Sequence, residues 1–488
     1  MKTMKMALLA GAAIAVSAAT AHADELSEMK AQIEALNARM AAMETAPSVP
    51  AGYQLLAVSK GEALQVPGLG DSDRDRVTNS RATIISVMPT ADAPAGTTIS
   101  WSGYVRAAVI YEGAEENETV KVYETDADGN KELLEKFDYS GNTDDDWDVK
   151  SRGQLRVVAT TDTAVGEVGV ELKMRADLNG NGTSDVYMKT AWGYWAMTPE
   201  LTFGGGYAGS LGNIGYGYDG ACTCYYTDNA DVGFDPGDTT QLRLSYASGP
   251  FSMGIALEDA SLKGDSVSGN NLGAAGEIKY SGDAFSGEIS GVYRSVNADD
   301  YGGSDTYFSD ISAATELFYD PDMDSLWQVG VGVGFSLGDI ASLSLAAAMG
   351  SGPLQLVDSS GDIYADYAVT NDWWGISGLA SANLSDTVHA EVGLGYKDRQ
   401  GDDYTLDNED GDAVAKFSGF DYNTWAILGG VYYTPVDQLT IGLEGEWYTT
   451  EISQDLKGAD GTVVEDISAN LDKTTDNWSV DLVSVWRF

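Results

Sequence analysis

The sequence has no long apolar run after its N-terminus, and it has few basic residues. Past the first residues it offers no apolar stretch of about eighteen positions, so no membrane-spanning helix is expected. Any crossing of a bilayer must then be made by β-structure. Only 28 Lys and Arg stand against 75 Asp and Glu, a formal net charge of −47. This balance excludes a nucleic-acid partner, because phosphates need cationic contacts, and it favours cations and divalent metal ions.

Proline and cysteine are also scarce, whereas glycine and aromatic residues are plentiful. The 11 Pro, 57 Gly, 26 Tyr and 11 Trp suit an all-β chain with aromatic girdles. The mean hydropathy of −0.18 agrees with strands in which every second residue faces water. The two cysteines, Cys222 and Cys224, are spaced for a tight disulfide at a loop tip, which an exported chain would form. A metal pair is less favoured, because no histidine is near.

The N-terminus has the features of a secretory signal. Lys2 and Lys5 precede an apolar stretch over 6–16, and Ala21-His22-Ala23 fits the cleavage rule. We therefore expect a signal peptide at 1–23 and a mature chain that begins at Asp24.

A helix is predicted at 24–46. Its apolar residues recur at alternating spacings of three and four, the heptad pattern of a coiled coil, and they are Leu26, Met29, Ile33, Leu36, Met40 and Met43. We expect a periplasmic helix that oligomerises or contacts the cell wall; the alternative is a short amphipathic helix docked on its own chain. Residues 47–96 contain two β-like runs, 53–59 and 81–88, which suit a linker, a plug or a small hairpin.

The remainder, 97–488, is a series of alternating segments. The last of them, residues 478–488, reads W-S-V-D-L-V-S-V-W-R-F, with one apolar and one polar face. Sixteen such segments can be placed, an even number as in closed bacterial barrels. They lie near 98–111, 151–161, 165–177, 185–197, 200–207, 239–247, 251–259, 271–281, 284–296, 326–337, 341–350, 373–384, 387–398, 422–434, 439–452 and 475–488.

The lengths of the connections alternate between short and long. Tight joints such as 162–163, 248–250 and 435–437 are separated by long polar stretches. Those stretches are 112–150, 208–238, 297–325, 351–372, 399–421 and 453–474. Short turns on one side and long loops on the other are typical of an outer-membrane barrel, and a soluble sandwich has no reason to sort its loops in this way.

The two parities of each segment differ in charge. Apolar residues such as Val105, Val170 and Leu244 share one face, and charged residues occupy the other. A Lys or Arg on the lipid face near the midplane costs about 2–4 kcal/mol, so the charges are assigned to a wet lumen. Basic residues concentrate on the first three strands and predict a basic wall of the pore, formed by Arg106, Arg152, Arg156, Lys173 and Arg175.

The third long loop, about 208–238, is predicted to fold into the barrel. Its acids are Asp219, Asp228, Asp231 and Asp235. If they oppose the basic wall across a narrow gap, the resulting transverse field penalises apolar solutes and tunes ion selectivity. From the acidic excess we expect a preference for cations.

Several sequence pieces together resemble the alphaproteobacterial outer-membrane porins, a family of general diffusion channels. The pieces are S-G-Y-V-R at 102–106, S-R-G-Q-L-R-V-V-A at 151–159, V-G-E-V-G-V-E-L-K-M-R at 165–175, L-T-F-G-G-G-Y-A-G-S at 201–210, L-R-L-S-Y at 242–246 and the terminal V-W-R-F. The resemblance implies a sixteen-stranded barrel with a constricting third loop, a homotrimer, contact with outer-membrane lipid and lipopolysaccharide, and passive uptake. It also places Arg106, Arg152, Arg156 and Arg175 in the family's basic wall. The heptad helix, the 47–96 region and the acidic excess depart from the family pattern.

Other chemistry is weakly represented. No nucleophile motif, phosphate loop or zinc-ligand cluster occurs, which disfavours an outer-membrane lipase or protease. Asp126, Asp128 and Asn130 imitate the start of a calcium loop, although the glycine falls at the wrong position. No cofactor is expected beyond structural Ca²⁺ or Mg²⁺ in such acidic loops. Glu444 and Glu446 are predicted to line the lumen. The alternative to a channel is a structural tether that uses the helix at 24–46, with transport secondary.

Overall fold

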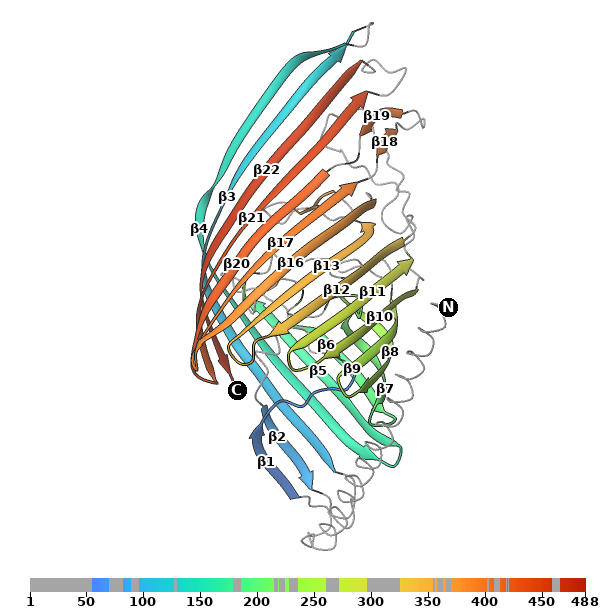
Figure 1. Ribbon diagram of the computed structural model, residues 1–488, viewed down its shortest axis with the longest axis vertical. Helices are drawn as coiled ribbons and strands as arrows, with labels where there is room; N and C mark the ends of the chain where they lie inside the picture. The colour runs from blue at the N-terminus through green and yellow to red at the C-terminus, as the bar shows by residue number, and fades with distance from the viewer. Residues whose placement is uncertain are drawn as a thin grey trace, which may run out of the picture. The chain divides into compact units, whose positions relative to one another are not determined.

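Figure 1 shows the computed structural model of the chain. The structure describes residues 55–69, 82–88, 96–126, 130–178, 186–214, 218, 224–227, 236–259, 272–295, 325–353, 356–357, 363–365, 370–401, 403–407, 413–417, 419, 421–458 and 466–488. The predicted signal peptide at 1–23 and the predicted helix at 24–46 lie outside these residues and remain predictions. None of the described residues forms a helix long and apolar enough to cross a bilayer.

The chain divides into two compact units. The first comprises residues 1–59 and 85–98, and the second comprises residues 60–84 and 99–488. Two short strands, β1 (Leu55–Gly61) and β2 (Ala82–Met88), pair with each other. They coincide closely with the two β-like runs of the sequence at 53–59 and 81–88.

The second unit contains a closed antiparallel barrel of sixteen strands, as predicted. Each strand pairs with the next barrel strand along the chain, and β22 pairs with β3 from Ile467↔Glu124 to Arg487↔Tyr104 to close the cylinder. The strands are β3 (Thr97–Thr125), β4 (Lys131–Thr163), β5 (Gly166–Leu178), β6 (Val186–Ala196), β7 (Leu201–Gly209), β8 (Asp238–Ser248), β9 (Phe251–Asp259), β10 (Leu272–Ser281), β11 (Phe285–Ser295), β12 (Ser325–Ser336), β13 (Ala341–Pro353), β16 (Thr370–Ser385), β17 (Val388–Gly401), β20 (Asp421–Val436), β21 (Leu439–Gly458) and β22 (Ile467–Arg487).

In the described parts of the long connections there are four short strands. β14 (Leu356–Val357) pairs with β15 (Ile363–Ala365), and β18 (Tyr404–Asp407) pairs with β19 (Ala413–Phe417). Seven joints between barrel strands are short, from the β4–β5 joint to the β20–β21 joint, and they alternate with the longer connections.

The predicted polar loop at 112–150 is wrong. β3 has 29 residues and β4 has 33, so both strands continue through this stretch and turn near 126–130. Figure 1 shows the two strands rising together beside β22. Acidic and other polar residues predominate over much of these outer halves, so the regular alternation of apolar and polar residues that marks a strand is weak there. Much of the predicted loop at 453–474 likewise belongs to β21 and β22.

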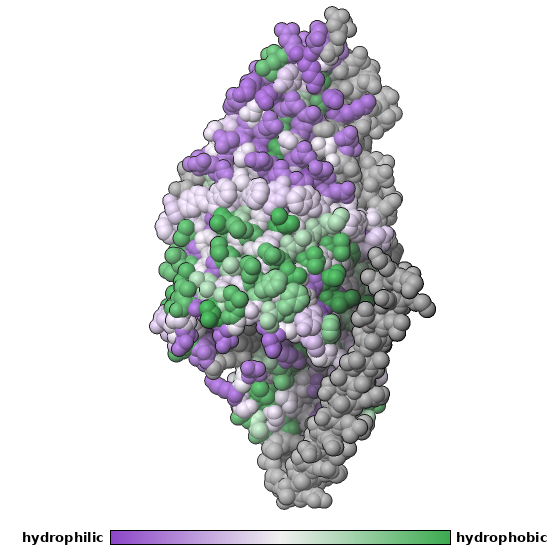
Figure 2. Space-filling model, viewed as in Figure 1, coloured by the Kyte–Doolittle hydropathy of each residue, from purple (hydrophilic) through white to green (hydrophobic). Residues whose placement is uncertain are grey.

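Burial in the barrel is the reverse of that in a soluble protein. Val105 and Leu172 are 50% and 43% exposed on the outer face, whereas Arg156 and Glu171 are each 2% exposed inside. Figure 2 shows the outer apolar residues as a belt, with hydrophilic residues above it. Since charged residues are rarely buried unless they are paired, this pattern requires lipid outside and a polar interior.

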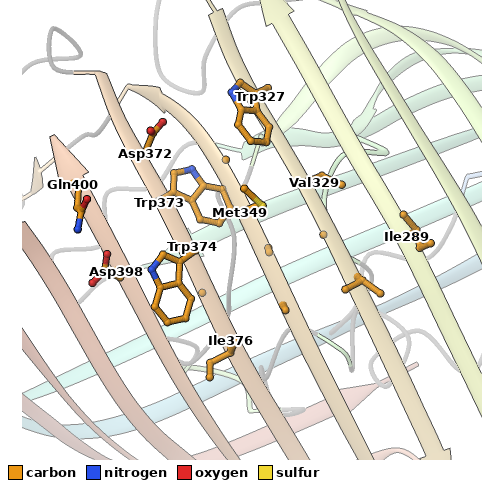
Figure 3. Close-up of a pocket in the computed structure, with 16 residues that line it drawn as sticks. Ile289, Trp327, Val329, Met349, Asp372, Trp373, Trp374, Ile376, Asp398 and Gln400 are labelled. Atoms are coloured by element: carbon orange, nitrogen blue, oxygen red, sulfur yellow. The ribbon is translucent and has the colours of Figure 1, made fainter. Parts of the chain in front are cut away.

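Aromatic residues mark both edges of the belt. Near the short turns, ring contacts link Phe251, Tyr280, Phe285 and Phe335 on consecutive strands. At the opposite ends of the strands, Tyr396 contacts both Trp374 and Trp425. Figure 3 shows Trp374 beside Met349 and Ile376 along a shallow apolar groove over β12, β13 and β16. Such girdles are expected where a barrel meets the two membrane interfaces.

Candidate pore constriction

The third loop connects β7 to β8 and lies inside the barrel. Its described residues are 210–214, 218, 224–227 and 236–237. They contact inward-facing side chains on strands from β9 around to β3, which can be reached only through the lumen. The described residues of this loop therefore lie inside the barrel.

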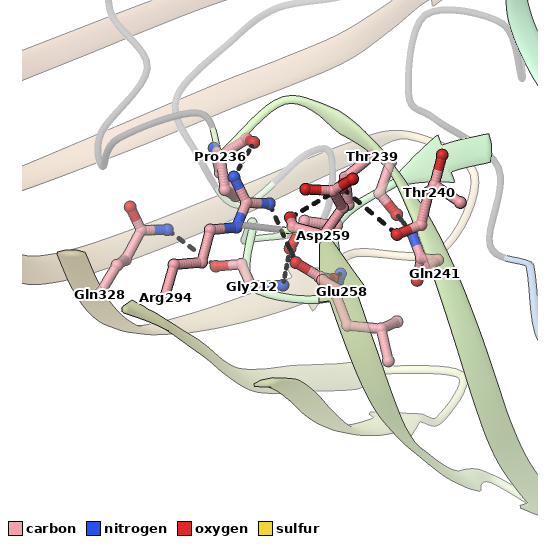
Figure 4. Close-up of polar contacts among 12 residues, drawn as sticks. Gly212, Pro236, Thr239, Thr240, Gln241, Glu258, Asp259, Arg294 and Gln328 are labelled. Carbon is pink, nitrogen blue, oxygen red and sulfur yellow. Dashed lines mark hydrogen bonds and ion pairs between the residues drawn. The ribbon is translucent and has the colours of Figure 1, made fainter. Parts of the chain in front are cut away.

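A buried ion pair holds both ends of the loop. Nη2 of Arg294 (β11) lies 2.9 Å from Oε2 of Glu258 (β9), and both side chains are completely buried. Glu258 accepts hydrogen bonds from the Ser210 hydroxyl at 2.9 Å and the Leu211 amide at 3.3 Å, where the loop begins. Arg294 donates to the Pro236 carbonyl at 2.7 Å, where the loop ends (Figure 4). Because a charged pair in such a site needs further hydrogen bonds to offset desolvation, pair and loop stabilise each other.

The next part of the loop packs against β12, at positions where two inward-facing residues of that strand are glycines. Gln328 on β12 donates to the Gly212 carbonyl at 2.8 Å. A Cβ at Gly330 would lie 2.3 Å from Cδ1 of Ile214, and a Cβ at Gly332 would lie 2.5 Å from Cβ of Tyr218. These two glycines therefore permit the close approach of the loop to the wall.

The tip of the loop is bound to the far wall by Glu444 of β21. One carboxylate oxygen accepts the Tyr225 amide at 2.6 Å, and the other accepts the Tyr226 amide at 3.0 Å. The Tyr432 hydroxyl adds a third hydrogen bond at 3.0 Å. Arg487 of β22 donates to the Tyr225 hydroxyl at 2.9 Å. Hydrogen bonds to an ionised acceptor are roughly twice as strong as neutral ones, so this carboxylate is the main polar attachment of the described tip.

Four of the predicted basic residues lie together on β4 and β5, and each has a carboxylate or carboxamide partner on the same two strands. Arg156 lies opposite Lys173 in the register, and both contact Glu171, at 2.7 and 3.7 Å. Arg152 forms an ion pair with Asp177. Arg175 donates to the Gln154 carboxamide at 2.9 and 2.8 Å.

Arg106 lies apart from these four, on β3. Its guanidinium stacks 4.6 Å from the centre of the Tyr226 ring and is covered by the loop. The predicted basic residues therefore lie in two places, four on β4 and β5 and Arg106 on β3 beneath the loop tip. The pairing register of β4 and β5 places Glu171 and Asp177 beside the basic side chains of these strands, and the loop tip covers Arg106. The loop acids Asp219, Asp228, Asp231 and Asp235 lie outside the described residues, so their role remains a prediction.

Comparison with known proteins assigns the family. A model of the porin subfamily matches residues 95–480. The chain belongs to the porin subfamily. It is similar to in-vitro folded OmpT, an outer membrane protein of Vibrio cholerae (12% identity, 80% of this chain and 98% of that chain, TM-score 0.45). It is also similar to the anion-selective porin from Comamonas acidovorans (12%, 80% and 100%, 0.40) and to Salmonella typhi OmpF in complex with daunomycin (12%, 79% and 97%, 0.41). No curated protein is detectably similar in sequence.

Family and architecture together give the activity. This porin is an outer-membrane barrel that forms a water-filled channel for passive diffusion of small hydrophilic solutes and ions. Family and fold favour a channel over an enzyme.

The remaining predicted sites of the porin are less defined. Cys224 is disulfide-bonded and fully buried, but Cys222 lies outside the described residues, so the pair stays a prediction. Asp126 accepts the Asn130 amide at 2.8 Å and so closes the β3–β4 turn, while Asp128 is not described. Among the described residues no three acids, histidines or cysteines group as metal ligands.

The residues that fix the third loop were not predicted as such. Parity places Glu258 and Glu444 in the lumen, but a single sequence does not reveal which distant strand a loop will reach. The one available signal is a charge inside a run of inward-facing small residues. Such a charge needs a partner, and a loop backbone can supply one.

Proposed function

We propose that this porin prefers cations and that its aperture is set by the third loop, held between the Glu258–Arg294 pair and Glu444. The observation that carries the proposal is the attachment of the loop tip to the wall opposite its root. A loop bound at both sides occupies part of the cross-section permanently, so solutes must pass beside it.

The cation preference is supported by the pairing of the basic residues. Arg156, Lys173 and Arg152 each lie beside a carboxylate, which reduces the positive field they can project into the pore. The chain as a whole carries a formal net charge of −47. Charged residues that line a pore select ions of the opposite sign, so an excess of unneutralised acids favours cations.

Reversal potentials in planar bilayers under a KCl gradient test this proposal. The wild type is expected to show cation preference; clear anion preference would overturn it. Glu171→Gln leaves Arg156 and Lys173 without their shared anion, so we expect a shift toward anions. Arg156→Gln should shift the potential in the opposite direction, whereas general damage to the barrel would move both variants the same way. Glu132→Gln removes the same charge from an exposed position of the β3–β4 hairpin and is the matched control.

We also propose that the porin is a homotrimer whose assembly is strengthened by the predicted helix at 24–46. The heptad spacing supports this, because three heptads are marginal alone but stable when packed together. Native mass spectrometry of the detergent-extracted mature protein and of a chain lacking 24–46 measures the effect. A monomeric full chain contradicts the trimer, and an unchanged trimer after deletion contradicts the role of the helix.

A further inference from the structure

A short segment ahead of the barrel strands lies within the lumen. Val66 and Leu69 of residues 62–69, here called the lumen segment, are 7% and 8% exposed. They pack in one cluster against four inward-facing side chains of β4, β6 and β7, namely Val158, Trp192, Tyr194 and Ala208. Because the outward neighbours of these four face lipid, the segment that covers them must be inside the cylinder.

The lumen segment lies at the end of the barrel that carries the short turns. The Leu64 amide lies 3.4 Å from the hydroxyl of Ser100, near the start of β3. A Cβ on Gly68 would lie 2.6 Å from Oγ of Ser245, close to the β8–β9 turn. Short turns face the periplasm in outer-membrane barrels, so this is the periplasmic mouth. The attachments of the third loop to Glu258 and Glu444 lie on other strands.

One buried arginine ties the lumen segment to the root of the third loop. Arg243 of β8 donates from Nη1 to the Gly68 carbonyl at 3.0 Å and from Nη2 to the Gly209 carbonyl at 2.8 Å. Its guanidinium lies 5.2 Å from the centre of the Trp192 ring, and the side chain is buried. A buried guanidinium is destabilising unless its N–H groups donate hydrogen bonds. Loss of either carbonyl would leave a buried donor of Arg243 unsatisfied, at a cost in folding free energy. The attachment is therefore specific.

Two residues of the lumen segment restrict the conformation of its backbone. Pro67 restricts its own φ, and Gly68 has a φ of +72°, in the left-handed region that other residues rarely adopt. Proline and glycine thus set the bend that presents the Gly68 carbonyl to Arg243. Glu62 and Pro67 are exposed, whereas Val66 and Leu69 face the wall. The side of the segment away from the wall is therefore the side that meets water.

We propose that residues 62–69 form a second constriction of the channel, on the periplasmic side of the third loop, which helps to determine which solutes and ions pass. Permeating ions first cross the gap beside the third loop and then the gap beside the lumen segment. Glu62 and the neighbouring Lys60 line the same cavity at this mouth, so charges of both signs stand beside the segment. This inference does not depend on the third loop being the narrower of the two.

Charge placed on Pro67 tests whether ions pass beside the segment. Pro67→Glu should shift the reversal potential toward cations, and Pro67→Lys should shift it toward anions. The controls are Val165→Glu and Val165→Lys, at an exposed position of the β4–β5 short turn on the same side of the membrane. In about 0.1 M salt the screening length is about 10 Å, so charges outside the ion path have little effect. Opposite shifts at position 67 alone support the proposal, and unchanged potentials in both Pro67 variants overturn it.

A second pair of variants tests the narrowing itself. Gly68→Ala strains the left-handed backbone and brings a methyl group against Ser245, which should loosen the segment and raise single-channel conductance. Gly249→Ala imposes similar strain at a φ of +57° in the β8–β9 turn, but no atom lies within 4 Å of its Cβ. Equal conductance in the two variants contradicts a second constriction. Variants of Glu444 would still change the third loop in that case, so the two proposals fail separately.

Discussion

Replacing Glu444 by Gln should release the tip of the third loop. The carboxylate accepts two loop amides, at 2.6 and 3.0 Å, through different oxygens. Gln has one acceptor oxygen, and its NH₂ group would face the other amide, so at least one bond is lost and the remaining one loses its charge. Hydrogen bonds to charged groups contribute about 1.5–3 kcal/mol and neutral ones about 0.5–1.5, so the replacement of two charged bonds by one neutral bond costs the tip about 2.5–4.5 kcal/mol. At tenfold per 1.4 kcal/mol, the ratio of released to bound loop rises about 60- to 1,600-fold.

Single-channel recording and liposome swelling measure this release. Glu444→Gln should show flickering current, a higher mean conductance and faster entry of larger saccharides than the wild type. Tyr432→Phe removes only the third hydrogen bond and leaves both amides bound, so its effect should be small. Glu451→Gln makes the same charge change at an exposed position of β21. A folded Glu444→Gln porin with wild-type current noise, conductance and exclusion size would refute the assignment of Glu444 as the attachment of the tip.

Three further predictions concern the loop root, the loop path and the lipid face. Arg294→Met should destabilise the root by about 3–5 kcal/mol, because it leaves the Glu258 carboxylate buried and unpaired. The double variant that also carries Glu258→Met should recover much of that loss. Thermal unfolding of the detergent-solubilised barrel measures both effects. Gly332→Val should displace Tyr218 from the wall and alter single-channel conductance. The barrel should remain folded, as shown by an unchanged band of folded protein in electrophoresis of unheated samples. Leu172→Arg, on the outer face, should cost about 2–4 kcal/mol in unfolding from lipid, and no loss there would contradict its place in the belt.

The sequence predicts those parts of the fold that depend on local alternation. All sixteen strands lie where period-two patterns occur, because lipid and water impose opposite chemistry on the two faces. The alternation is weak in residues 112–125 and 131–150, where polar residues predominate, and these residues form strands that the sequence did not predict.

The site was predictable in composition but not in pairing. Parity assigns Arg156, Lys173 and Glu171 to the lumen, and knowledge of the β4–β5 register would have paired them. The contacts of Glu444 with Tyr225 and Tyr226 join residues more than two hundred positions apart and depend on the path of a loop with no periodic pattern. A plug was one of three alternatives for 47–96, but the position of the lumen segment and its contact with Arg243 could not be read from spacing.

Planar bilayer recording of the purified mature porin tests whether the closed barrel encloses a continuous path of water past the third loop. Discrete current steps of uniform size, whose amplitude rises with salt concentration, are expected. Protein that is shown to be folded and inserted, yet passes no current at any voltage, would contradict this expectation.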